Sequence, residues 1–154
     1  MLDLVFKNNT SQKILSEKFF KKILVTGIKE LKIQDKNVEL SLNLVGEAKI
    51  KELNKKYRSK NVTTNVLSFS LKEPRLKKYG ILPLGDIFIC LPFAVKEAER
   101  QNISLEKELA WLTVHGLLHL LGYDHPDDEV SGPRLKRRGE KMFQLENKIL
   151  NKIK

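Results

Sequence analysis

The sequence lacks the features that mark several common protein classes. Among its 154 residues there is a single cysteine, Cys90, which excludes an intramolecular disulfide framework. No apolar run approaches the roughly 18 residues of a membrane-spanning helix, and the short apolar start carries Asp3 and lacks a signal-peptide core. There is no internal repeat, and no RRM or KH motif. These absences predict a cytoplasmic protein with no membrane partner, folded as a single domain over residues 1–154.

Acidic residues are scarce relative to basic ones. The chain has 19 Asp and Glu against 29 Lys and Arg, a formal net charge of +10, and a sequence pI of about 9.7. Such a balance favours a polyanionic partner, with nucleic acid as the first candidate. Because most of the excess is lysine, a biased amino-acid composition is the alternative explanation.

The hydrophobic pattern predicts an α+β fold. Alternating or continuous apolar segments indicate strands, and stripes with helical spacing indicate helices. The predicted strands are 2–6, 38–45, 66–71 and 87–91; the predicted helices are 11–31, 48–57, 92–101, 105–121 and 135–153. Helix 105–121 is apolar nearly all round, which is typical of a buried central helix. We therefore expect a small mixed β-sheet packed against this helix and further helices.

All three histidines fall in one short segment, His115-Gly-Leu-Leu-His119-Leu-Leu-Gly-Tyr-Asp-His125. His115 and His119 are four residues apart and so share one face of the predicted helix. Gly122 can end that helix in a left-handed conformation, which lets the chain turn back and bring His125 toward the same point. Three converging imidazoles predict a zinc site with these three ligands.

The number of ligands favours a catalytic rather than a structural ion. Structural zinc sites usually close with four protein ligands, most of them cysteines. Cys90 lies in a different, apolar segment and is predicted to be a buried, inert thiol. The fourth position would then be left to water, whose pKa falls to about 7 on zinc. Three imidazoles also suit nickel and copper.

The residue after the first histidine limits the chemistry. The spacing His-x3-His-x2-Gly-x2-His is also that of the metzincin proteases, in which this residue is a glutamate that acts as general base. Here it is Gly116, which has no side chain to move a proton. The ligand frame of a metalloprotease is thus present without its base, so peptide hydrolysis by that route is not expected.

Four segments resemble the YbeY family of bacterial zinc-dependent endoribonucleases. The run HGLLHLLGYDH matches the family motif, and three further segments follow in family order: LNKKYR at 53–58, TNVLSF at 64–69 and LGDI at 84–87. The chain departs from the family at Asn65, which replaces a usual Asp, and at Ser70, which replaces a frequent Pro. The change at Asn65 leaves open any role of the family's carboxylate.

The resemblance implies a function and a residue for it. It implies a single-strand-specific, metal-dependent endoribonuclease that acts in ribosomal RNA maturation at the 3′ end of 16S RNA, and in ribosome assembly or quality control. It implies one zinc ion held by His115, His119 and His125, and it places the family's functional arginine at Arg58, where a guanidinium would bind phosphoryl charge. Ribosomal RNA, and ribosomal proteins or assembly factors, would be the partners.

Two other functions remain open at this point. One is a non-catalytic ribosome-assembly factor whose metal serves the fold, and the other is a metal-dependent hydrolase of another substrate. For two further features of the sequence, Asp124 and the basic run 134–141, two explanations each remain open. Asp124 could orient a ligand imidazole or only stabilise the turn. The basic run 134–141 could contact RNA or only form the solvated face of a helix.

Overall fold

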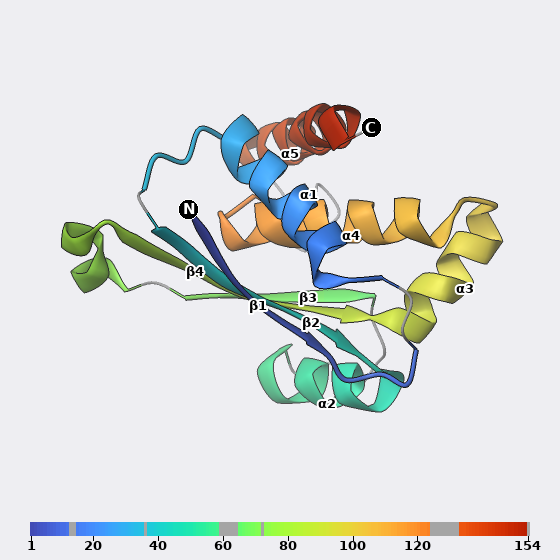
Figure 1. Ribbon diagram of the computed structural model, residues 1–154. Coiled ribbons are helices and arrows are strands. Elements are labelled where there is room, and N and C mark those ends of the chain that lie inside the picture. The colour runs from blue at the N-terminus through green and yellow to red at the C-terminus, as the bar shows by residue number, and fades with distance from the viewer. Residues whose placement is uncertain (13–14, 36, 59–64, 72, 124–132, 154) are drawn as a thin grey trace.

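The computed structural model describes residues 1–12, 15–35, 37–58, 65–71, 73–123 and 133–153 (Figure 1). The elements follow the predicted order, with one short 3-10 helix added before the last strand. They are β1 (Leu2–Asn8), α1 (Glu17–Glu30), β2 (Asn37–Val45), α2 (Glu47–Arg58), β3 (Val66–Ser70), η1 (Pro74–Tyr79), β4 (Ile81–Cys90), α3 (Leu91–Gln101), α4 (Leu105–Leu120) and α5 (Pro133–Ile153). Within these ranges, no helix is both long and apolar enough to cross a bilayer.

The four strands form one mixed sheet in the order β1-β2-β4-β3. The pairs β1–β2 and β2–β4 are parallel, whereas β3 pairs with β4 in the antiparallel direction. Parallel neighbours need a helical crossover, which α1 supplies between β1 and β2. The predicted α+β fold with a small mixed sheet is confirmed.

Helices cover the two faces of the sheet unequally. Among the described helices, α1, α4 and α5 lie on one face and α2 lies on the other (Figure 1). Helix α4 is in the middle of the larger layer, where it contacts α1, α5, β3 and β4. Its buried residues outnumber those of any other described helix, so the prediction of a central buried helix is confirmed.

The predicted helix 11–31 begins too early. Helix α1 starts at Glu17, after Ser16 in an extended conformation. Upstream, the Asn8 side-chain oxygen accepts a hydrogen bond from the Thr10 amide at 3.0 Å, and the Asn8 amide donates to the Gln12 carbonyl at 2.8 Å. Short polar side chains that bond to the nearby backbone compete with the helix, which delays its start.

The predicted strand 87–91 is too short, since β4 begins six residues earlier at Ile81. Pro83 and Gly85 weaken the strand pattern in this part of the sequence. The structure accommodates them where β2 and β4 shift register next to Glu39 and Leu40. Gly85 has φ of +133°, and a Cβ there would lie 2.0 Å from the Phe69 carbonyl oxygen, so only glycine fits. The residues just before β4 form the short 3-10 helix η1.

Candidate metal centre

Helix α4 is fixed at its start by a cap and along its length by the sheet. The Ser104 side chain accepts a hydrogen bond from the Lys107 amide at 3.1 Å, which satisfies one of the free amides of the first turn. A Cβ at Gly116 would lie 2.9 Å from Cγ2 of Ile87, so the missing side chain lets α4 approach β4 closely. Gly116, which stands where metzincin proteases have their general base, therefore has a packing role.

Two hydroxyl groups of β3, the strand at one edge of the sheet, form hydrogen bonds to α4. Ser68 Oγ donates to the Gly116 carbonyl and Ser70 Oγ donates to the Leu120 carbonyl, each at 3.2 Å. The two serines alternate with Leu67 and Phe69, so they occupy the strand face that points to α4. These bonds fix the helix segment that carries both histidines.

The two histidines of α4 converge as their spacing predicts. Nε2 of His115 lies 2.9 Å from Nε2 of His119, and the ring centroids are 4.4 Å apart. Two imidazole ligands of one tetrahedral zinc ion, each bonded at about 2.0–2.1 Å, have their nitrogens roughly 3.3 Å apart. A small opening of the pair therefore gives the spacing that one ion requires, and neutral imidazole is a donor that zinc accepts.

A carboxylate from α5 orients the first histidine. Oε1 of Glu146 lies 3.0 Å from Nδ1 of His115, and the two side chains are only 2% and 13% exposed. Because a carboxylate accepts hydrogen bonds, it favours the tautomer in which Nδ1 carries the proton. Nε2 then presents its lone pair on the side of His119, as metal-binding histidines commonly do when the other nitrogen donates to a carboxylate.

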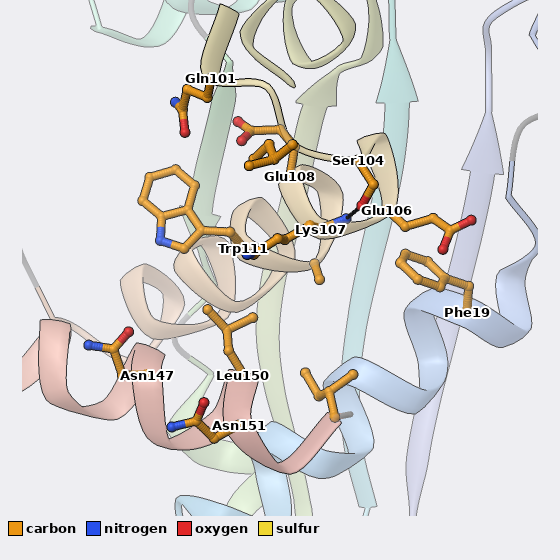
Figure 2. A pocket seen from close by; sticks show the side chains of 13 residues that line it. Phe19, Gln101, Ser104, Glu106, Lys107, Glu108, Trp111, Asn147, Leu150 and Asn151 are labelled. Atoms are coloured by element: carbon orange, nitrogen blue, oxygen red, sulfur yellow. Dashed lines mark hydrogen bonds between the residues drawn. The ribbon is translucent and has the colours of Figure 1, made fainter. Parts of the chain in front are cut away.

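An aromatic side chain on α4, that of Trp111, packs against the His115 ring. The Trp111 ring lies one helical turn earlier, with its centroid 5.0 Å from that of the imidazole. Trp111 also lines a groove of about 870 Å³ between the start of α4 and the end of α5 (Figure 2). The indole thus contacts both the His115 ring and this groove.

The end of α4 has the predicted geometry. Gly122 has φ of +92°, the Gly122 amide donates to the His119 carbonyl at 3.0 Å, and the Tyr123 amide donates to the Leu118 carbonyl at 3.0 Å. This is the pattern in which a left-handed glycine closes the last turn and reverses the chain. The predicted helix 105–121 is therefore confirmed, and its last residue is Leu120.

The family comparison decides the relationship. The family model described as Endoribonuclease YbeY matches residues 5–154. The chain belongs to the YbeY endoribonuclease family. Similar proteins named Endoribonuclease YbeY come from Sulfurihydrogenibium sp. (37% identity; 97% of this chain and 91% of the relative), Oenococcus oeni (38%; 97% and 95%) and Phytoplasma australiense (40%; 95% and 92%). The solution structure of TM1509 from Thermotoga maritima has a TM-score of 0.60 at 26% identity and covers 98% of this chain and 89% of that one.

The remaining predicted site residues stay predictions. His125 and Asp124 lie outside the described residues, and so does the side chain of Arg58. The Arg58 backbone ends α2, on the sheet face opposite α4 (Figure 1). Across the described ranges, no group of three or more His, Cys, Asp or Glu side chains is placed to hold a metal ion. His115 and His119 are thus the two predicted ligands that the structure brings together.

Cys90 lies apart from the histidines. It is fully buried at the end of β4, and burial raises the pKa of its thiol above the ordinary value. A raised pKa disfavours the thiolate, the form that binds metal and reacts. The prediction of a buried thiol is confirmed.

Glu146 is the site residue that the sequence analysis missed. It lies on the apolar stripe of the last helix, four residues after Met142 and three before Ile149, both of which are fully buried. An acidic residue on a buried helical face is rarely left without a partner. That pattern was available in the sequence, but the partner, 31 residues earlier, was not.

Proposed function

We propose that the protein is a zinc-dependent endoribonuclease that cleaves single-stranded RNA during ribosomal RNA maturation, including the 3′ end of 16S RNA, and that it works in the cytoplasm. The YbeY family match supports ribonuclease chemistry on RNA. The observation that carries the metal part is the convergence of two Nε2 atoms beside a buried, orienting carboxylate. Ribosomal proteins or assembly factors would deliver or regulate the enzyme.

His115, His119 and His125 would hold one zinc ion. When bound, this ion supplies a Lewis acid for a phosphoryl oxygen and lowers the pKa of a nearby nucleophile. Glu146 keeps the His115 ring in the tautomer and rotation that such a ligand needs. Gly116 has no side chain that could transfer a proton, and Ile87 fills the space where one would lie.

Arg58 would act on the phosphate rather than on the metal ligands. Cleavage of a phosphodiester builds negative charge on the phosphoryl oxygens, and a guanidinium binds that charge with two parallel hydrogen bonds. Such a group accelerates the reaction by binding the transition state more tightly than the ground state. Removal of Arg58 is therefore expected to lower the cleavage rate while the metal stays bound.

The test compares four proteins on one single-stranded ribosomal RNA fragment. The wild type, His119→Ala and Arg58→Ala are purified in parallel with Lys18→Ala, which removes an exposed cation on α1. We expect His119→Ala to lose both zinc and cleavage, Arg58→Ala to lose cleavage alone, and Lys18→Ala to keep both. Equal cleavage by all four would point to a contaminating nuclease and favour an assembly factor with a structural metal.

The ends of the products identify the attacking group. A 2′,3′-cyclic phosphate end means that the ribose 2′-hydroxyl attacks the phosphorus. A simple phosphate end together with incorporation of oxygen from labelled water means that water attacks. Mass spectrometry of the same cleavage reactions distinguishes the two.

A further inference from the structure

An exposed tyrosine stands at the end of α2, on the sheet face opposite the histidines. Tyr57 is 58% exposed, yet its ring packs against another aromatic ring. Its centroid lies 5.1 Å from that of Phe69 on β3, with an angle of 60° between the planes, and Phe69 lies 5.8 Å from Phe88 on β4. Edge-to-face contacts of this kind are favourable and give the ring a preferred orientation. Tyr57 is thus a packed aromatic ring that remains open to solvent.

Positive charge surrounds this surface. Helix α2 carries five basic residues against two acidic ones over its 12 residues. The Lys56 amine lies 5.2 Å from the Tyr57 centroid, and Lys55, Lys56 and Tyr57 are all exposed. A ring flanked by cations suits a ligand that has flat, aromatic groups and negative charges in alternation. Single-stranded nucleic acid is such a ligand, and bases stack on aromatic side chains without regard to sequence.

The position links this surface to the candidate metal centre. Strand β3 lies at one edge of the sheet, and its successive side chains point alternately to the two faces of the sheet. Ser68 and Ser70 contact α4, the helix of the histidines, whereas Phe69 contacts Tyr57 on the other side. Both features therefore flank the same edge of the sheet, and Arg58 follows Tyr57 directly in the chain.

We propose that Tyr57 is a stacking platform for one base of the single-stranded RNA substrate, with Lys55 and Lys56 beside the adjoining phosphates. The proposal rests on the ribonuclease function above and adds the place where the strand is held away from the metal. The RNA crosses the edge of the sheet at β3, between the base on Tyr57 and the candidate metal centre. A folded protein that bound the same surface would not need to stack on the ring. Its affinity would therefore not depend on whether residue 57 is aromatic, as in Tyr57→Phe, or aliphatic, as in Tyr57→Leu.

The test measures binding rather than cleavage. A fluorescently labelled single-stranded RNA is titrated with the wild type, Tyr57→Leu, Tyr57→Phe and Tyr57→Trp, each also in a His119→Ala background to prevent turnover. The loss of one base–aromatic stack is expected to weaken binding about five- to hundredfold in Tyr57→Leu, while the Phe and Trp variants bind like the wild type. Tyr79→Leu is the matched control, since Tyr79 is 65% exposed with Lys78 5.1 Å from its ring but lies on η1.

The outcomes separate this proposal from the ribonuclease function. Binding by Tyr57→Leu that equals the wild type, or an equal loss in Tyr79→Leu, overturns the platform alone. No RNA binding by the wild type overturns the ribonuclease function and the platform with it. If Tyr57→Leu does not fold, photocrosslinking of the wild type to RNA that contains 4-thiouridine replaces it. A crosslink in the peptide with Tyr57 then supports the platform, and its absence from that peptide overturns the platform.

Discussion

The two faces of the sheet carry functional groups of opposite character. On the α4 face, His115 and Glu146 are nearly buried and hydrogen-bonded to each other, and serines of β3 fix the helix beneath them. On the α2 face, Tyr57 and the lysines beside it are exposed. An ion needs a few donors held within a fraction of an ångström, whereas a flexible polymer needs charge and flat surfaces that remain accessible. Substitutions on the first face should therefore change metal affinity and folding, and those at Tyr57 and the lysines beside it should change RNA affinity alone.

The largest effect is expected from His119→Ala on the α4 face. His119→Ala removes one of the two converging imidazoles, which are the proposed ligands. Loss of a group that only hydrogen-bonds to a ligand weakens metal binding by up to about a hundredfold. Loss of a ligand itself should therefore lower zinc affinity by more than that. Cleavage should fall with it. Zinc content by mass spectrometry and single-turnover cleavage measure the two effects. A folded variant that keeps one zinc per chain would contradict the proposed site.

The next effect is expected at Glu146, which orients His115 without being a predicted ligand. Glu146→Leu should weaken zinc binding about 10- to 100-fold, and Glu146→Gln, which still accepts a hydrogen bond but carries no charge, should weaken it less. Competition with a coloured chelator measures both affinities. Nitrogen-15 shifts of the His115 ring in the metal-free protein give an independent readout of the tautomer.

The control for Glu146 is Glu140→Gln, the same change at an exposed position of α5. It should leave zinc affinity unchanged. If Glu146→Leu binds zinc as tightly as the wild type, the carboxylate only stabilises the packing of α5 on α4 and does not position the ligand.

Gly116→Ala tests how closely the α4 face is packed. The new Cβ would lie 2.9 Å from Cγ2 of Ile87, so either the helix or the strand must move. Overpacking of this kind costs about 1–3 kcal/mol of unfolding free energy, measured by urea denaturation. In an Ile87→Ala background the cost should shrink, because the contact is gone. An equal cost in both backgrounds would assign the effect to something other than this contact.

Lys56→Ala tests the α2 face, where only RNA affinity should respond. For a single strand, removal of one phosphate contact makes the negative slope of log affinity against log salt shallower by about 0.7. The melting temperature should not change, because the side chain is exposed. Lys18→Ala, an exposed lysine on α1, is the control and should keep the wild-type slope. Equal slopes for wild type and Lys56→Ala would remove Lys56 from the RNA surface.

The sequence predicts the α4 face better where the information is local. Ser104, the i, i+4 histidines and Gly122 act within a few residues of one another, so the capped helix, the converging pair and the left-handed glycine at the helix end could all be foreseen. Glu146 meets His115 across 31 positions, and no local pattern names that partner. The early half of β4 was missed for the same reason, since Pro83 and Gly85 fit a strand only through a register shift against β2.

The smallest effect is expected at the far end of α4, where a second buried acid lacks the role that Glu146 has. Burial, together with repulsion from Glu97 and despite attraction from Arg100, raises the pKa of Glu108 above its ordinary value. The folded state therefore binds the Glu108 proton more tightly than the unfolded state does. Its stability declines as the pH rises from the unfolded pKa to the folded pKa, and stays lower above that.

Glu108→Gln should consequently raise the free energy of unfolding at pH 7, and its advantage should shrink as the pH falls to about 3, below the unfolded pKa, where both states hold the proton. Urea denaturation at the two pH values measures the difference. Glu106→Gln, an exposed change in the same helical turn, should show no such gain, since it only removes a favourable charge near the start of the helix. A Glu108→Gln variant less stable than the wild type at pH 7 would mean that the ionised carboxylate makes a favourable contact. Glu108 would then resemble Glu146 as an acid retained on the α4 face for its charge.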